Sequence, residues 1–258
     1  MVKMPNNNKA MKVYPGKKPE TVMVLLFGRG YVFMEQFTAP ESVLGNHFDA
    51  EREQVFDHMA PHWDVMIPPV PSKKIRELIA TADVEGKTVL DVGAGTGALV
   101  EAGLAAGPRQ WIACDLSLEM LKVLEAKYKG NVDGVLAPAV SRRLSLLHAD
   151  VHSLPLEQAS VDRVICHNAF PHFHQPKVAL AQLFRAMRPG GFLIINHFSG
   201  REFINQVHRF APQAILHMDL LVPADEAAEW LREVGFAVTG VADSRQLYRI
   251  TAVRPGGG

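Results

Sequence analysis

Three histidines, His167, His172 and His174, lie within eight positions of one another in the stretch CHNAFPHFHQP. Aromatic residues and prolines stand between them. An imidazole can remove a proton near neutral pH, and in its neutral form it can bind a transition metal. The stretch is therefore part of a catalytic site, part of a metal site, or a strand end that is rich in histidine.

Two more histidines follow at positions that can join the first group. The run FLIINHF predicts a buried strand ending near His197, and GREFINQVHRF predicts a helix that carries His208. In a doubly wound sheet, chemistry gathers beyond the carboxyl ends of the strands. We expect His172 and His197 to line one acceptor site, with His208 as a third candidate, and one of them to be the general base.

The same three histidines could instead bind Zn²⁺ or another transition metal, because catalytic metal sites often use three protein ligands. No carboxylate or cysteine is placed beside them in the sequence, so we assign no metal ligand. We expect His148, His152 and His174 on the surface or in turns, without a role.

From Lys87 onward, short apolar runs alternate with amphipathic runs of ten or more residues. This alternation predicts an α/β fold, with a doubly wound and mostly parallel sheet covered by helices on both faces. One of these runs, KVALAQLFRAMRPGG, predicts a helix closed by Pro189 and Gly190. The C-terminal run ADEAAEWLREVGFAVTGVADSRQLYRITAVR predicts a helix followed by two strands.

The chain before this alternation predicts an appendage and two covering helices. Residues 1–47 are rich in Asn, Lys, Pro and Gly, and we expect an extension that is partly disordered or folds over the domain as a lid, with VMVLLF as one short strand. Residues 48–254 are expected to form the domain, beginning with helices at 50–60 and 72–81. His58, His62 and Trp63 either cover a ligand or pack the first helix on the domain.

Two further stretches receive no functional role. Residues 131–143 stand where a short loop is expected, so they predict a small insertion, and residues 255–258 predict a loose tail.

The overall composition excludes several classes of partner. The 258 residues include 27 basic and 27 acidic side chains, without basic runs, which argues against a nucleic acid or an anionic membrane surface. The two cysteines, Cys114 and Cys166, lie in apolar runs and predict reduced core residues. The polar N-terminus has no signal-peptide core or membrane span, which predicts a cytoplasmic protein.

The segment LDVGAGTGAL places Gly93, Gly95 and Gly97 between the first strand and its helix. Glycines at such a corner let a ligand approach the backbone and the helix N–H groups. The run also satisfies the looser dinucleotide fingerprint. However, Asp91 precedes the first glycine by two residues, where it would repel a pyrophosphate but can anchor a loop around a cationic amino-acid ligand.

Two further acids end the next strands of the expected sheet. Asp115 can accept hydrogen bonds from ribose hydroxyls, and Asp150 can accept one from an exocyclic adenine amine. With these acids in place, the motifs resemble the class I S-adenosylmethionine-dependent methyltransferases over Val89–Arg254. The resemblance rests on VLDVGAGTG, CDLS, ADVHSLPL, VDRVICHNAF and MRPGGFLII, in the expected order.

The resemblance implies a Rossmann-like sheet of seven strands whose last strand is antiparallel, S-adenosylmethionine as cofactor, and methyl transfer. HNAFPH is not the Pro-Pro-aromatic motif of nucleic-acid amino-methyltransferases, so the chain looks more like the small-molecule branch of ubiquinone/menaquinone-type methyltransferases. One alternative is a protein that keeps the cofactor fold but uses the histidines for metal-assisted or other chemistry. Another is a non-catalytic cofactor-binding module.

The resemblance also implies roles for single residues at the cofactor. Gly93, Ala94 and Gly95 would form the floor under its methionine and ribose. Asp91 would lie beneath the loop, Asp115 and Leu116 would contact the ribose, and Asp150 and Val151 would surround the adenine. His167 would either lie beside the cofactor or only form a hydrogen bond with the backbone.

Overall fold

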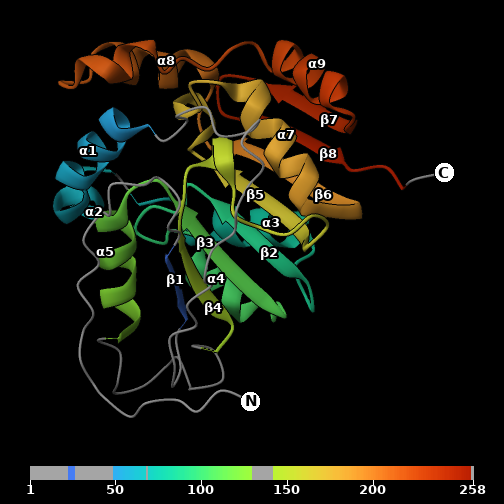
Figure 1. The fold of residues 1–258 in the computed structure, drawn as a ribbon. Helices are drawn as coiled ribbons and strands as arrows, with labels where there is room; N and C mark the ends of the chain where they lie inside the picture. The colour runs from blue at the N-terminus through green and yellow to red at the C-terminus, as the bar shows by residue number, and fades with distance from the viewer. Residues whose placement is uncertain (1–22, 27–48, 68, 130–141, 257–258) are drawn as a thin grey trace.

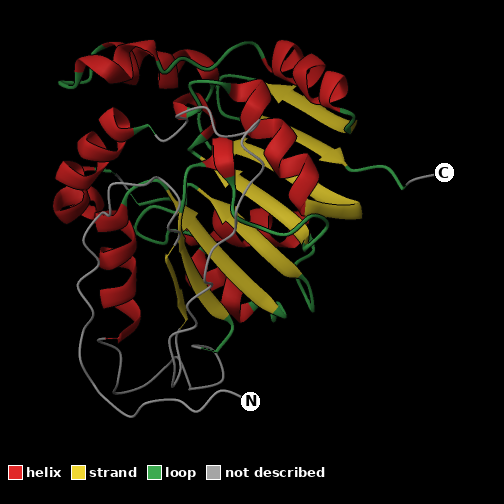
Figure 2. Ribbon diagram, viewed as in Figure 1, coloured by secondary structure: helices red, strands yellow, loops and turns green. Residues whose placement is uncertain are grey.

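The computed structural model describes residues 23–26, 49–67, 69–129 and 142–256, which form a sheet with helices on both faces (Figures 1 and 2). Apart from one strand, the expected N-terminal extension lies outside the described residues, as does the expected insertion up to residue 141. No helix among the described residues has the length and apolar character needed to cross a bilayer.

The sheet has eight strands in the order β1-β4-β3-β2-β5-β6-β8-β7. Their bounds are β1 (Met23–Leu26), β2 (Thr88–Val92), β3 (Gln110–Asp115), β4 (Leu144–His148), β5 (Val161–His167), β6 (Met187–His197), β7 (Ala237–Asp243) and β8 (Tyr248–Val253).

Strands β2 to β8 form the predicted seven-stranded sheet. The neighbours β4, β3, β2, β5 and β6 are parallel, and the last strand, β8, runs antiparallel to both β6 and β7. Strand β1 comes from the VMVLLF run and adds an eighth strand, antiparallel to β4, at the edge of the sheet. The prediction of the fold class is thus confirmed, with one strand more than expected.

Two groups of helices cover the faces of the sheet. One face carries α3 (Ser72–Ala82), α4 (Val100–Ala105) and α5 (Leu118–Lys129). The other carries α7 (Pro176–Ala186) and α9 (Ala224–Val234). All five residues of β2 are buried, as expected for a central parallel strand with helices on both sides.

The remaining helices lie in the connections. They are α1 (Ala50–Met59), α2 (Trp63–Met66), α8 (Arg201–Arg209) and the short 3₁₀ segments η1 (Ala60–His62), η2 (Val151–Ser153), η3 (Phe170–His172) and η4 (Ala214–Met218).

Helix α7 ends at Ala186, so the prediction that it closes at Pro189 and Gly190 is wrong. Strand β6 begins at Met187, and Gly190 donates its N–H to the Arg254 carbonyl. The guanidinium of Arg254 also donates to the carbonyls at the end of α7, 2.9 Å from that of Phe184. Arg254, directly after β8, therefore caps the C-terminal end of α7, and this contact with a distant residue could not be read from the local sequence.

Helix α5 begins as predicted. The hydroxyl of Ser117 accepts the Met120 N–H at 3.1 Å and donates to Asp57 of α1 at 2.6 Å. Asp57 also accepts the N–H of Glu119 at 3.1 Å. Helix α1 is thus attached to the start of α5 by capping hydrogen bonds.

The contact between α4 and β3 generates a test of the packing. A Cβ atom at Gly103 would lie 2.3 Å from the fully buried ring of Trp111. We expect Gly103→Ala to lower the free energy of unfolding by about 1–3 kcal/mol, because the ring has no space to move into. Urea unfolding measures this, with Ala105→Ser on the exposed side of α4 as the matched control. Equal stability of both variants would contradict the packing.

Candidate active site

A cavity that is partly open to solvent lies at the carboxyl ends of β2, β3, β4 and β5. Its wall combines the glycine loop, the strand ends and the covering helices. The residues that line it are Asp49, Phe56, Trp63, Val92, Gly93, Gly95, Cys114, Asp115, Leu116, Met120, Ala149, Asp150, Val151, His152, Asn168, Ala169, His172 and Phe173.

The glycine loop forms the floor of this cavity and requires its glycines. Gly93 and Gly95 have φ angles of +69° and +53°, in the left-handed region that favours glycine. A Cβ atom on Gly93 would lie 2.3 Å from the Cβ of Ala169. Ala94 is buried and donates its N–H to the Cys114 carbonyl, and it does not line the cavity.

Asp115 joins this loop to the end of β3. Its Oδ2 accepts the Gly95 N–H at 2.7 Å, and its Oδ1 accepts the Ser117 N–H at 2.8 Å. Burial raises the pKa of Asp115, although both backbone donors oppose the shift. The side chain thus has a fixed orientation and retains lone pairs that can accept ligand hydroxyls.

Asp91 lies beneath the loop and does not line the cavity. Its carboxylate accepts a hydrogen bond of 3.3 Å from the indole of Trp111. Burial raises the pKa of Asp91 to about 7, with the Trp111 hydrogen bond opposing the shift and nearby Asp115 adding to it. Asp91 can therefore act on a ligand only through the loop.

Asp150 forms the far wall with a histidine that received no role in the sequence analysis. His152 is 3% exposed, so the expectation of a surface position is wrong. Its Nδ1 lies 2.5 Å from Oδ1 of Asp150, and its Nε2 accepts the Gln175 N–H at 3.2 Å. Because a backbone N–H can only donate, Nε2 of His152 is the acceptor in this geometry and Nδ1 is the nitrogen that faces Asp150. Asp150 is the N-cap of η2, two residues before His152, and this short spacing is the feature of the sequence that could have indicated the pair.

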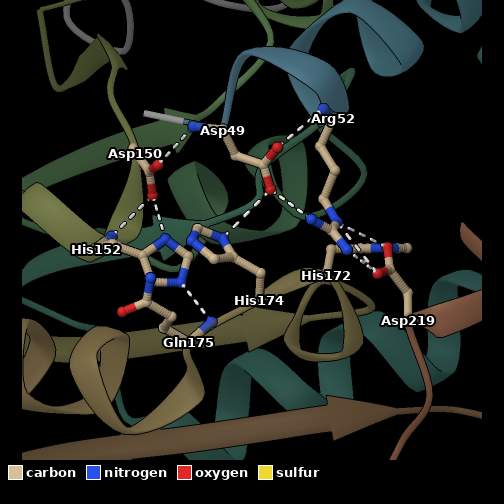
Figure 3. Close-up of polar contacts among 8 residues, drawn as sticks. All are labelled: Asp49, Arg52, Asp150, His152, His172, His174, Gln175 and Asp219. Carbon is tan, nitrogen blue, oxygen red and sulfur yellow. Dashed lines mark hydrogen bonds and ion pairs between the residues drawn. The ribbon is translucent and has the colours of Figure 1, made fainter. Parts of the chain in front are cut away.

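His172 lines the cavity and contacts a second buried carboxylate (Figure 3). Its Nδ1 lies 2.7 Å from Oδ2 of Asp219, a residue that is 1% exposed in the connection before α9. Arg52 of α1 binds the same carboxylate, with its Nε 3.1 Å from both oxygens. Burial would raise the pKa of Asp219, but the hydrogen bonds from His172 and Arg52 lower it overall. Asp219 is therefore a carboxylate that is paired with both His172 and Arg52.

The other predicted histidines lie farther from the cavity. His208 packs on His172, with ring centroids 4.9 Å apart, and its Nδ1 donates to the backbone carbonyl of Asp219. His197 is 1% exposed and does not line the cavity, because strand pairing sets its ring against Tyr248. Neither ring nitrogen of His197 has a hydrogen-bond partner among the described residues, and burial lowers its pKa well below the usual value.

His167 is also buried away from the cavity wall. Its Nδ1 lies 3.0 Å from the backbone carbonyl of Asn196, and burial lowers the pKa of His167 to about 4. The backbone contact is the simpler of the two interpretations that the sequence allowed. No group of three or more His, Cys, Asp or Glu side chains in the described ranges is arranged to hold a metal ion.

The covering helices close the cavity from above. Phe56 and Trp63 line it and contact each other, whereas His58 and His62 are exposed and do not. Asp49, the N-cap of α1, donates its backbone N–H to Asp150 at 3.1 Å, and its carboxylate lies 3.2 Å from His174. The sequence did not indicate these contacts, because they join segments that are far apart in the chain.

The raised pKa of Asp91 generates a pH prediction. An aspartate in an unfolded chain titrates near about 4, so the folded protein holds one proton more between about pH 4 and 7. The free energy of unfolding contributed by this group therefore falls as pH rises through that window. We expect Asp91→Asn to gain stability relative to the native chain from pH 5 to 7 and to level off above 7.

Urea unfolding at pH 5, 6, 7 and 8 tests this, with exposed Asp225→Asn as the control. A difference between Asp91→Asn and the native protein that stays constant with pH would contradict the shift.

Known proteins share the domain that this cavity belongs to. Residues 90–195 match the family model described as a methyltransferase domain. A demethylmenaquinone methyltransferase of Renibacterium salmoninarum is 32% identical over 154 residues, which are 58% of this chain and 59% of that protein. An O-methyltransferase of Penicillium expansum is 28% identical over 171 residues, 66% of this chain and 59% of that protein.

The chain thus spans less than two thirds of the length of these relatives. Among solved structures, the (4+2)-cyclase SpnF has a TM-score of 0.63 at 17% identity, covering 80% of this chain and 96% of that one, which shows a shared fold. Residues 90–195 therefore match a methyltransferase domain, and the chain is similar to the quinone-methyltransferase-like branch of the class I S-adenosylmethionine-dependent methyltransferases.

Proposed function

We propose that this protein transfers a methyl group from S-adenosylmethionine to a small acceptor from which His172 removes a proton. The observation that carries this proposal is the 2.7 Å contact between Nδ1 of His172 and the buried carboxylate of Asp219, at the wall of the cavity. Such a pairing fixes the imidazole tautomer and leaves Nε2 as the proton acceptor.

The cofactor would lie on the glycine loop, between the acids of two strand ends. Gly93 and Gly95 leave space for it, Asp115 and Leu116 would meet its ribose, and Asp150 and Val151 its adenine. Each acid already accepts backbone N–H groups, and a carboxylate has further lone pairs for ligand hydroxyls or an amine. These residues therefore fit the charge and the hydrogen-bonding groups of this cofactor.

S-adenosylmethionine supplies an electrophilic methyl group on a sulfonium, so this chain must align the acceptor and take up its proton. Among the described residues, Nε2 of His172 has no hydrogen-bond partner, whereas its Nδ1 is held by Asp219. His208 supports the same loop through the Asp219 carbonyl. His197 lies deeper in the core than His172. His208 and His197 are the alternative candidates for the base.

The wall around His172 favours an apolar ring as acceptor. Phe56 meets the imidazole edge-on with ring centroids 5.0 Å apart, and Trp63 and Phe173 also line the cavity. Aromatic walls of this kind bind flat apolar molecules and exclude water. The relatives named demethylmenaquinone methyltransferases support a quinone-like ring as the acceptor class.

The first test concerns the cofactor. We expect the protein to bind S-adenosylmethionine and not NAD, and Asp115→Asn to weaken that binding by about 1–3 kcal/mol, because an acceptor for the ribose is lost. Calorimetry with both ligands measures the affinities. Asp162→Asn, at the opposite end of the sheet beside Arg109, is the control. NAD binding without S-adenosylmethionine binding would overturn the proposal.

The second test concerns the base. We expect His172→Ala to lower turnover of a quinone-like acceptor by about 10²–10⁴-fold, while the affinity for S-adenosylmethionine stays nearly unchanged. Exposed His217→Ala on η4 is the control. Normal turnover by His172→Ala would reject His172 as the base.

Metal analysis of the purified protein accompanies this test. A stoichiometric metal that is lost on His172→Ala would favour the metal-assisted alternative. Cofactor binding without methyl transfer to any acceptor would favour other chemistry on the same fold.

A further inference from the structure

Asp49, the N-cap of α1, and Arg52 in its first turn bond to two different segments of the site, at Asp150 and at Asp219 (Figure 3). The backbone N–H of Asp49 donates to Asp150, on the side proposed for the adenine. Arg52, three residues later, binds Asp219, which in turn holds His172 on the side proposed for the acceptor. One helix therefore contacts both the cofactor side and the partner of the proposed base.

Arg52 fixes the Asp219 carboxylate in one orientation. Its Nε lies 3.1 Å from both oxygens and its Nη2 lies 2.5 Å from Oδ1, while its Nη1 lies 2.5 Å from Oδ2 of Asp49. The planar guanidinium matches a carboxylate in this way, which a point charge cannot do. Rotation of Asp219 away from His172 would break these hydrogen bonds.

The attachment of α1 to the rest of the domain is mostly polar. Within Ala50–Met59, Met59 is the one buried residue, and Phe56 packs on His172 and Trp63. Hydrogen bonds and ion pairs make the other attachments, including Glu53 with His148 at 3.0 Å and Asp57 with the start of α5. A helix held mainly by such contacts opens at a lower free-energy cost than one anchored by apolar burial.

We propose that Arg52 is a positioning residue, which aligns the base when α1 closes over the occupied cofactor cavity. This inference rests on the proposed function. With α1 closed, Asp219 is held by Arg52 and its Oδ2 faces Nδ1 of His172. With α1 open, the carboxylate can rotate and the imidazole loses its fixed tautomer. Cofactor that binds on the Asp150 side favours the closed position of α1. Closure of α1 then fixes the orientation and the tautomer of His172.

The charged and titratable groups that face His172 come from several elements. Asp219 contacts it directly, Arg52 approaches from α1, and His208 packs on it from α8. Asp115 and His197 interact with it electrostatically from farther away. Of these, Arg52 carries the positive charge that balances Asp219, so its loss would favour the protonated imidazole.

The experiment compares Arg52→Gln and Arg52→Lys with Arg232→Gln, an exposed arginine of α9 that pairs with Glu229. We expect Arg52→Gln to lower kcat by about 10–100-fold, as is typical when a partner that orients a functional side chain is lost. In the same variant, the rise of kcat on the acidic side of the pH profile should move to higher pH. Arg52→Lys should restore the position of that rise and part of the rate, and cofactor affinity should change little.

Two readouts do not depend on methyl transfer. Hydrogen exchange should show that S-adenosylhomocysteine protects residues 50–59 in the native protein and much less in Arg52→Gln. Nitrogen NMR of His172 should show the Nδ1–H tautomer in the native protein and a mixture in Arg52→Gln. Because Arg52→Gln leaves Asp219 paired with His172 alone, the double variant with Asp219→Asn provides a folded comparison for the exchange measurement.

The outcomes separate this inference from the proposed function. If Arg52→Gln keeps the native pH profile, tautomer and protection while His172→Ala is inactive, the positioning role is wrong and the base stands. If no acceptor is methylated, the proposed function fails, and the tautomer and the exchange data still decide the role of Arg52. A tautomer that is independent of Arg52 overturns the inference in either case.

Discussion

The parallel arrangement of β2, β3, β4 and β5 is the constraint from which the site follows. Parallel strands place their carboxyl ends at one edge, so residues that are distant in the sequence meet there. This edge brings together the glycine loop, Asp115 and Asp150, and it places His172 in the loop after β5. The antiparallel β8 lies beyond β6, so it completes the sheet without interrupting this edge.

Buried carboxylates at one edge need donors, and the structure supplies them in three ways. Asp115 accepts two backbone N–H groups, Asp150 pairs with His152, and Asp219 pairs with Arg52 and His172. Asp91 has only the Trp111 indole, and burial raises its pKa accordingly. Differences in the available donors thus explain why carboxylates at similar depth differ in their protonation.

The covering helices differ from the core in how they are held. The helices on the sheet faces bury apolar side chains in two continuous clusters, whereas α1 buries Met59 alone and is attached mostly by capping contacts and ion pairs. This contrast suits a site that must admit a cofactor and then exclude water. Aromatic residues of the cover, Phe56 and Trp63, form part of the cavity wall, so opening of the helix would also open the wall.

The family resemblance implied the antiparallel last strand. The sequence by itself determined the α/β alternation, the glycine loop and the acids at the strand ends. Each of these is recorded in local periodicity or in a short motif, because backbone geometry depends mostly on near neighbours. Only the tertiary structure decided the partners. Arg52 and Asp219 are separated by 167 positions, and no local pattern links them. Similarly, His197 is a polar residue at a strand end, yet strand pairing buries it against Tyr248, while His152, which was expected to have no role, lines the cavity. Local sequence indicates which residues reach an edge of the sheet, but the packing of distant segments determines which of them meet.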